Sequence, residues 1–304
     1  MAVMTTTVLR TSATPRSRRW SPWGYVFALP HGLGLAVFTL LPIVVALVMG
    51  TYNWPTLGEK TFVGPRNYVM LLGDDTFLAA LRNTCVFVVL YLPLNLVVSM
   101  GMAAWLSPRI RGRQFFRVLF FLPVVTPIVA NSVVWKMLYQ PQGALDWAVR
   151  TLTGSPAPNF LNSETWAMPA IVLMTVWQGF GYNMLVFSAA LDSVPDSLVE
   201  AASLDGATAW QSFWRVRLPM VTPSVFFATT MTLITSFQVF AQPFILTKGG
   251  PGNATITLVQ YVYNQGFRYS KLGLASAGAT ILFSIILVVT AIQFLGQKKW
   301  VHYE

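Results

Sequence analysis

The chain has 304 residues, of which 55% are hydrophobic and 10% are charged, and its net charge is +10. A soluble domain usually carries about 25% charged residues, so this composition excludes a water-soluble globular protein and indicates an integral membrane protein. We interpret the positive charge as arginine and lysine retained on one side of a membrane, not as a nucleic-acid surface. The single cysteine, Cys85, excludes a disulfide within the chain, and no residue cluster has metal-ligand spacing.

Residues 1–24 form a polar and basic N-terminal segment that we expect to be cytoplasmic. The apolar run at residues 25–50 is predicted to be the first transmembrane helix, with kinks at Pro30 and Pro42. A cleaved signal peptide is the alternative, but its apolar core would be only about 7–15 residues long. A turn-rich outer loop follows at residues 51–79.

The core membrane region at residues 80–297 contains five further apolar runs, and a basic cytoplasmic tail follows at residues 298–304. Pro123 and Pro127 should break the second of these runs, and a short interfacial helix is expected near Leu145–Leu152. The predicted fold is an all-α polytopic membrane protein with about six transmembrane helices. After the first helix, its spans are expected near residues 84–106, 116–138, 168–191, 219–246 and 272–295.

A short loop between the second and third spans carries four arginines, at positions 109, 111, 113 and 117. Short loops rich in arginine and lysine stay in the cytoplasm, so this loop is predicted to be cytoplasmic, together with both chain termini. A DNA-binding patch is the alternative, but a membrane span on either side argues against it.

The polar segment at residues 193–218 cannot cross a membrane and is predicted to form two short helices. Ser193 is a candidate N-cap of the first helix, with Pro195 in its first turn. Gly206 should end that helix, and Thr208 with Gln211 forms a capping box for the second. Pro219 should stop or kink the second helix at Leu218. By pattern alone, the segment could equally be an amphipathic helix pair at the membrane surface.

The residue sequence of this segment resembles that of a known loop. The run EAASLDGA, followed by a polar helix and LPMVTP, resembles the EAA loop of permease subunits of maltose-type carbohydrate ABC importers. The phrases FVGPRNY, FFLPVVTP and TKGGPGNAT also resemble that family, in its sugar and sn-glycerol-3-phosphate branch. The resemblance implies the type I ABC importer fold, with a cytoplasmic coupling helix that docks on an ATPase. The residues it assigns to this role are Glu200, Ala201, Asp205 and Gly206.

The resemblance also implies partners and a location. Such a permease works with a second, related permease, two copies of an ATP-binding subunit and an extracytoplasmic substrate-binding protein, in the lipid of a bacterial inner membrane. ATP and magnesium are bound by the partners. We expect no cofactor, catalytic residue or metal in this chain, which is therefore no enzyme by itself. It has no phosphate-binding loop, since its only Lys-Thr pair, Lys60-Thr61, follows Glu59 instead of glycine.

An ion-coupled secondary transporter is the main alternative function. No aspartate or glutamate falls within a predicted span, and proton-coupled transporters commonly need one there. A membrane enzyme is a more distant alternative, because no nucleophile motif occurs.

Polar residues on the two spans that flank the EAA loop are candidates for a substrate path. Four candidates recur at helical spacing on one face of the fourth span, and two more share a face of the fifth span. The candidates are Thr175, Gln178, Gly179, Tyr182, Thr232 and Ser236. Such groups also hydrogen-bond neighbouring helices, which is the alternative. With Trp135 and Trp177 nearby, they predict a sugar or glycerol-phosphate derivative, carried by alternating access.

Overall fold

The computed structural model describes residues 22–107, 110–299 and 301. Most of the basic N-terminal segment, Arg109 and residues 302–304 of the tail lie outside the described residues. The chain divides into two units, residues 1–45 and 46–304. We describe each unit by itself.

The first unit is built from apolar helix, which continues past Val45 to Met49 at the start of the second unit. Helix α1 (Pro22–Leu35) leads through a π-helical turn at Ala36–Leu40 into α2 (Leu41–Met49). Together, residues 25–49 are long and apolar enough to cross a membrane. Pro30 lies inside α1, whereas Pro42 directly follows the π-helical turn. Proline has no N–H to donate, so a local change of hydrogen-bond register is expected beside it.

The second unit contains the remaining spans and their loops. It begins with a hairpin of two antiparallel two-residue strands, and all of its other elements are helices or helical turns. In order these are β1 (Tyr52–Asn53), β2 (Thr61–Phe62), α3 (Arg66–Leu72), α4 (Asp75–Leu106), α5 (Arg113–Val125), α6 (Ile128–Leu138), α7 (Ala144–Thr153), α8 (Ala167–Ser193), α9 (Asp196–Leu204), α10 (Ala209–Ser212), a π-helical turn (Phe213–Arg217), α11 (Leu218–Met220), α12 (Thr222–Phe237), α13 (Ala241–Leu246), α14 (Leu258–Tyr263), a second π-helical turn (Asn264–Arg268), α15 (Leu272–Gly296) and a 3-10 turn (Gln297–Lys299).

The described part of the chain has five helical segments long and apolar enough to span a membrane, or six if the bent pair α5–α6 counts as one span. This confirms the predicted number of about six. The helix of the second span begins at Asp75, earlier than predicted, because Asp74 caps it and accepts hydrogen bonds from the amides of Thr76 and Phe77. The interfacial helix expected near Leu145–Leu152 is α7.

The third and fifth spans are interrupted. Helices α5 and α6 meet at an angle of 95°, with the break at Thr126 and Pro127, while Pro123 remains inside α5. The break lies there because Pro127 disfavours helical geometry in the residue before it. Side chains hydrogen-bond the carbonyls that the break exposes: Thr126 donates to Leu122, and Asn131 donates to Pro123. The fifth span pauses at residues 238–240, between α12 and α13.

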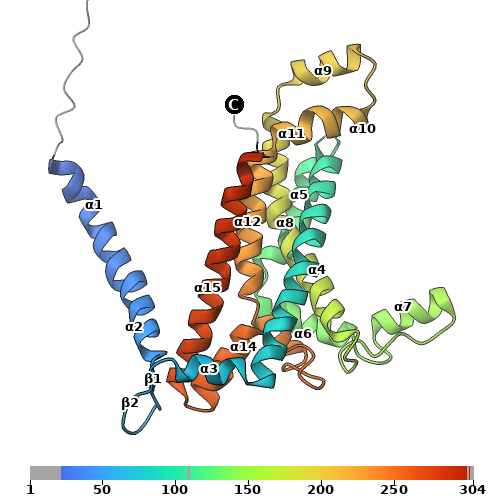
Figure 1. Cartoon of the computed structure of the whole chain (residues 1–304). Coiled ribbons are helices and arrows are strands. Elements are labelled where there is room, and N and C mark those ends of the chain that lie inside the picture. Colours follow the sequence, from blue (N-terminus) through green and yellow to red (C-terminus); the bar gives the residue numbers. More distant parts are fainter. Residues whose placement is uncertain (1–21, 108–109, 300, 302–304) are drawn as a thin grey trace, which may run out of the picture. The chain divides into compact units, whose positions relative to one another are not determined.

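Helix α8 packs against α4, α5 and α12 and is the most buried of the spans (Figure 1). Two glycines allow its neighbours to approach closely, as small residues do in membrane helices. A Cβ atom at Gly181 would lie 2.3 Å from the carbonyl oxygen of Phe120 on α5. A Cβ atom at Gly179 would lie 2.6 Å from the hydroxyl of Tyr91 on α4.

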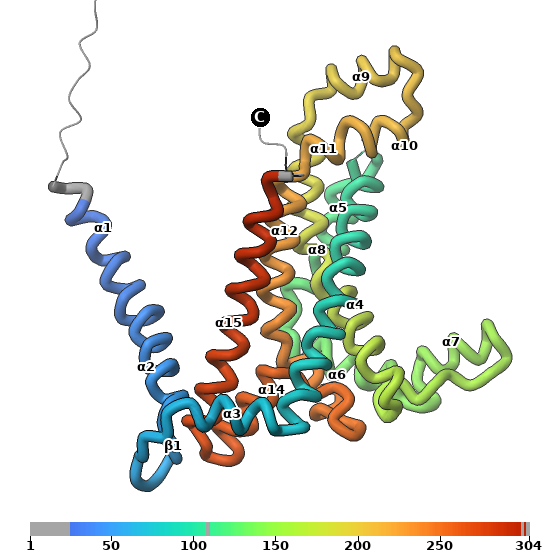
Figure 2. The backbone as a smooth tube through the Cα atoms, viewed as in Figure 1, coloured from blue at the N-terminus to red at the C-terminus, as the bar shows by residue number. Residues whose placement is uncertain are grey.

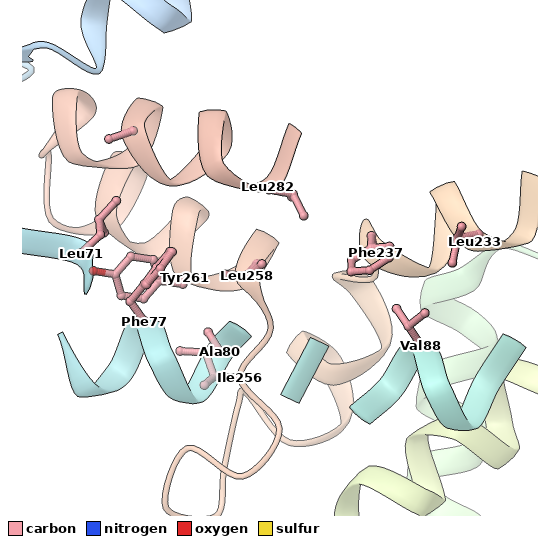
Figure 3. Close-up of a cluster of buried hydrophobic side chains, with 11 residues drawn as sticks. Leu71, Phe77, Ala80, Val88, Leu233, Phe237, Ile256, Leu258, Tyr261 and Leu282 are labelled. Atoms are coloured by element: carbon pink, nitrogen blue, oxygen red, sulfur yellow. The ribbon is translucent and has the colours of Figure 1, made fainter. Parts of the chain in front are cut away.

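A second packing region joins α3, α4, α12, α14 and α15. Figure 3 shows its buried side chains, with Phe77 and Tyr261 stacked edge to face at 5.3 Å between ring centroids. Tyr261 also donates a hydrogen bond to the Asp74 carboxylate. Burial, aided by that carboxylate, raises the pKa of the Tyr261 hydroxyl, which therefore stays protonated. This cluster fixes the end of the bundle opposite α9.

Candidate functional site

The polar loop between α8 and α12 forms two helices, as predicted, and Figure 2 traces its path away from the spans and back. Helix α9 ends in a Schellman motif: the amide of Ala207 donates to the carbonyl of Ala202, and that of Gly206 to Ser203. Gly206 has a φ of +81°, a left-handed conformation that favours glycine. A Cβ atom there would meet nothing within 4 Å, so the conformation alone selects the residue.

The predicted capping box of the second helix is present. The amide of Gln211 donates to the Thr208 hydroxyl, and the Gln211 side chain accepts from the Thr208 amide.

The prediction that Ser193 caps the first helix was wrong. Ser193 is the last residue of α8 and donates to the carbonyl of Ala190, because Pro195 holds Val194 extended and α9 begins only after it.

Pro219 does not end the second helix at Leu218, which has helical φ and ψ of −63° and −44°. A π-helical turn at residues 213–217 precedes it, and the Leu218 amide donates to the carbonyl of Phe213. This shift in register accommodates a proline that has no N–H to donate. The helical path therefore continues to Met220.

All four residues predicted for coupling are exposed on this loop: Glu200, Ala201, Asp205 and Gly206. Among the residues that the structure describes, none forms an ion pair or hydrogen bond with the Glu200 side chain. The same loop carries exposed apolar side chains, with Leu204 90% and Trp210 70% exposed. Exposed apolar groups beside an unpaired charge are typical of a surface that another protein covers.

Charged residues tie this loop to the arginine-rich loop. Asp192, in the last turn of α8, forms salt bridges with Arg113 and Arg117 of α5, an arrangement that we call the arginine clamp. Arg217 donates to the Ser107 hydroxyl at the end of α4. The arginine-rich loop and α9 are thus at the same end of the second unit (Figure 1). The sequence analysis missed Asp192, because it ended the fourth span at Leu191.

The substrate-path candidates do not share one environment. Tyr182 is 47% exposed, whereas Thr175, Thr232 and Ser236 are buried. Thr175 and Ser236 donate to carbonyls of their own helices. Gly179 faces Tyr91 of α4. The side-chain carbonyl oxygen of Gln178 is buried and has no hydrogen-bond partner among the described residues. Thr232 accepts a hydrogen bond within a cluster of polar side chains.

That cluster connects three spans. The Asn183 amide on α8 donates to Asn95 of α4 at 2.7 Å and to Thr232 of α12 at 2.8 Å. All three side chains are buried, and we call them the amide cluster. The sequence analysis named Thr232 but missed both asparagines, because only the fold brings residues 88 positions apart into contact. The cluster holds the helices that flank the EAA-like loop.

The end of the second unit opposite α9 is built from loops that side chains hold in place. Asn83 of α4 donates to the carbonyls of Asn253 and Ile256. Asp146 accepts from the amide of Ala157 and from Arg150. These two hydrogen bonds, the backbone one first, lower the pKa of the Asp146 carboxyl. The carboxylate therefore stays ionised and fastens α7 to the following loop.

Comparisons with known proteins match most of the chain. The family described as "Binding-protein-dependent transport system inner membrane component" matches residues 95–301. The lactose transport system permease protein LacF of Rhizobium radiobacter is 33% identical over 290 residues, covering 94% of this chain and 96% of that protein. The sn-glycerol-3-phosphate transport system permease protein UgpA of Yersinia pestis bv. Antiqua (strain Antiqua) is 35% identical over 289 residues, covering 94% and 96%.

A solved structure has the same fold. In a bacterial alginate ABC transporter in complex with an alginate pentasaccharide-bound periplasmic protein, one chain superposes with a TM-score of 0.80 at 20% identity. The match covers 91% of this chain and 94% of that chain.

Proposed function

Because the chain belongs to the family of binding-protein-dependent transport system inner membrane components, we propose that it is a permease subunit of an ATP-driven importer with the type I fold. It would pass a sugar or a glycerol-phosphate derivative through a bacterial inner membrane by alternating access. Permeases for lactose and for sn-glycerol-3-phosphate among its relatives support this range of substrates.

The observation that carries the proposal is the exposed carboxylate of Glu200, which has no partner among the described residues and lies on a helix that follows a membrane span after a break of two residues. An ATPase subunit on the cytoplasmic side would receive this helix, and a cation on that subunit would pair with Glu200. The arginines at the same end favour a cytoplasmic location for it. Since only Val194 and Pro195 separate α8 from α9, movement of the docked helix would reach the packed spans.

The assembled importer would contain a second permease, two ATP-binding subunits that hold ATP and magnesium, and an extracytoplasmic binding protein. This chain supplies the membrane path and no catalytic group of its own. Of the predicted path residues, the exposed Tyr182 is the best placed to meet a solute, whereas the buried Gln178 carbonyl would meet one only if the helices move apart. Thr175, Gly179, Thr232 and Ser236 would instead support the helix packing behind them.

Transport by the purified complex in vesicles tests this proposal against an ion-coupled transporter. Uptake of a radiolabelled sugar or glycerol-phosphate should require ATP on the side that carries α9, and should persist when ionophores collapse all ion gradients. Uptake that needs no ATP and stops with ionophores would identify a secondary transporter and overturn the proposal.

The orientation can be tested separately in cells, on a Cys85→Ser background. Cysteines at Leu204 and Leu152, which are 90% and 86% exposed, should differ in their reaction with a membrane-impermeant thiol reagent. Leu152→Cys should be labelled from outside, and Leu204→Cys should be labelled only after the cells are opened. The reverse pattern would place α9 outside, where it could not meet an ATPase.

A further inference from the structure

A pocket of about 380 Å³ opens at the outer end of the second unit. Three segments form it: the end of α6, the loop before α8 and the loop after α13. The residues that line it include Lys136, Gln140, Asn159, Asn162 and Lys248. The volume lies within the range of about 300–1,000 Å³ that is usual for small-molecule sites.

Hydrogen bonds within the chain hold the walls of this pocket. The buried Tyr139 donates to the carbonyl of Ala170 at 2.8 Å, which fixes the end of α6 to α8. On the opposite wall, the hydroxyls of Thr247 and Thr255 are 2.6 Å apart, and Thr255 donates to the carbonyl of Gly250. The pocket is therefore formed before any ligand arrives, which lowers the entropic cost of binding.

The charge of the lining is positive. It contains two lysines and no carboxylate. Within the described residues, neither Lys136 nor Lys248 has an ion pair or a hydrogen bond from its side chain. Two carboxylates lie near: Asp146, which is already bonded to Arg150, and Glu164, which lies beside Gly252. Neither lines the pocket, so its two ammonium groups remain available to an anion.

The neutral amide residues that line the same pocket favour a ligand that also carries hydroxyl groups. Gln140, Asn159 and Asn162 can donate to and accept from hydroxyl groups. By contrast, the amide cluster in the middle of the spans contains no charged side chain. A phosphorylated solute that reached only the amide cluster would have its charge poorly compensated.

We propose that the outer pocket binds the phosphate group of a small hydroxylated phosphate monoester before it enters the membrane path. The two lysines would pair with the phosphate, and the amides would hold the hydroxyls. This inference rests on the proposed importer function and narrows its substrate class to the phosphorylated members. Because one lysine is half-buried and the other exposed, binding should weaken as salt concentration rises.

Binding to the purified full chain in nanodiscs of zwitterionic lipid tests this inference. The probes are sn-glycerol-3-phosphate, inorganic phosphate and glycerol, measured by saturation-transfer NMR titration without any partner protein. The two phosphates should bind, with the monoester tighter, and glycerol should not. Lys136→Ala and Lys248→Ala should each weaken binding by about tenfold or more, since each removes a charge-assisted hydrogen bond. Lys271→Ala, at an exposed lysine of the same end outside the pocket, should change nothing.

Equal binding of glycerol and its phosphate, or unchanged binding in both pocket variants, would overturn the inference. Displacement of the phosphates by anionic lipid added to the nanodiscs would also overturn it, because the pocket would then be a headgroup site. These results leave the importer function intact as long as ATP-driven uptake of a neutral sugar is observed. Loss of ATP dependence would instead contradict the function itself.

Discussion

The amide cluster and the EAA-like loop are both polar regions between apolar helices, but their side chains are partnered differently. The side-chain nitrogen of Asn183 donates to two acceptors inside the chain, on α4 and α12, while its carbonyl oxygen is buried without a partner among the described residues. Glu200 is exposed and finds no partner among the described residues. Most buried polar groups are paired where the protein folds, whereas an exposed one can wait for another protein. The first region therefore assembles this subunit, and the second is suited to join it to others.

The largest effect on folding is expected where α8 meets α5. Gly181→Ala would place a methyl group against the Phe120 carbonyl, which backbone movement must relieve at a cost of about 1–3 kcal/mol. Gly101→Ala is the matched control, since a Cβ there meets nothing within 4 Å, and it should be neutral or stabilising by up to about 1 kcal/mol. Unfolding of the purified chain by SDS measures both. Equal stability of the two variants would mean that α8 and α5 are not in close contact.

The amide cluster should contribute a smaller amount. Asn183→Leu removes two hydrogen bonds and should destabilise the chain by about 0.6–2 kcal/mol, the range found for such bonds between membrane helices. Thr232→Val removes only one of these two hydrogen bonds, so it should destabilise the chain less. Because the two residues share one bond, the double variant should be less destabilised than the sum. Strict additivity in the same SDS titration would show that they do not interact.

The arginine clamp lies at the same end of the second unit as α9, but both sides of its salt bridges belong to this chain. Its partners are 22–35% exposed, so Asp192→Asn should change the free energy of unfolding by only about 0–1 kcal/mol. The difference should shrink at high salt, because solvent ions screen exposed pairs. In a chain whose Arg113 and Arg117 are already replaced by glutamine, Asp192→Asn should leave the free energy of unfolding unchanged. A large, salt-independent loss would mean that the clamp is part of the buried core.

The smallest effect is expected at α7. The folded state lowers the pKa of Asp146, so its stabilising contribution is present above the ordinary value of about 3.9 and is lost as the pH falls through the lower, folded value. Asp146→Asn should speed hydrogen exchange of the α7 amides at neutral pH and leave the spans unchanged. Once the pH is low enough to protonate Asp146 in the folded state, the exchange rates of the two proteins should converge, after correction for intrinsic rates. A difference that persists there would show that the charge of Asp146 is irrelevant.

Local sequence signals predicted the coupling end better than the interior. The left-handed Gly206 and the Thr208 capping box follow from residues within a few positions of each other. The clamp and the amide cluster join residues 49–88 positions apart, and no local pattern carries that information. At Pro219 the local rule failed, because a π-helical turn nearby changed the hydrogen-bond register. Apolar runs located the spans, and Pro127 predicted the break in the third span, although no sequence signal gave its angle of 95°.

We propose that the EAA-like loop, docked on an ATPase, transmits ATP hydrolysis to the spans. Two variants address it: Glu200→Lys reverses the exposed charge, and Gly206→Pro cannot adopt the φ of +81°, because the proline ring holds φ near −65°. Glu164→Lys, an exposed acidic residue at the outer end, is the control for charge reversal alone.

Uptake and substrate-stimulated ATPase of the reconstituted complex, measured together, give the most direct test. We predict that both loop variants insert in the membrane at normal levels but lose uptake and stimulated ATPase in parallel. If the pair made by Glu200 is desolvated at the interface, the loss corresponds to about 3–5 kcal/mol of docking free energy. Glu164→Lys should keep its stimulated ATPase. Fully coupled transport by both loop variants would contradict the account.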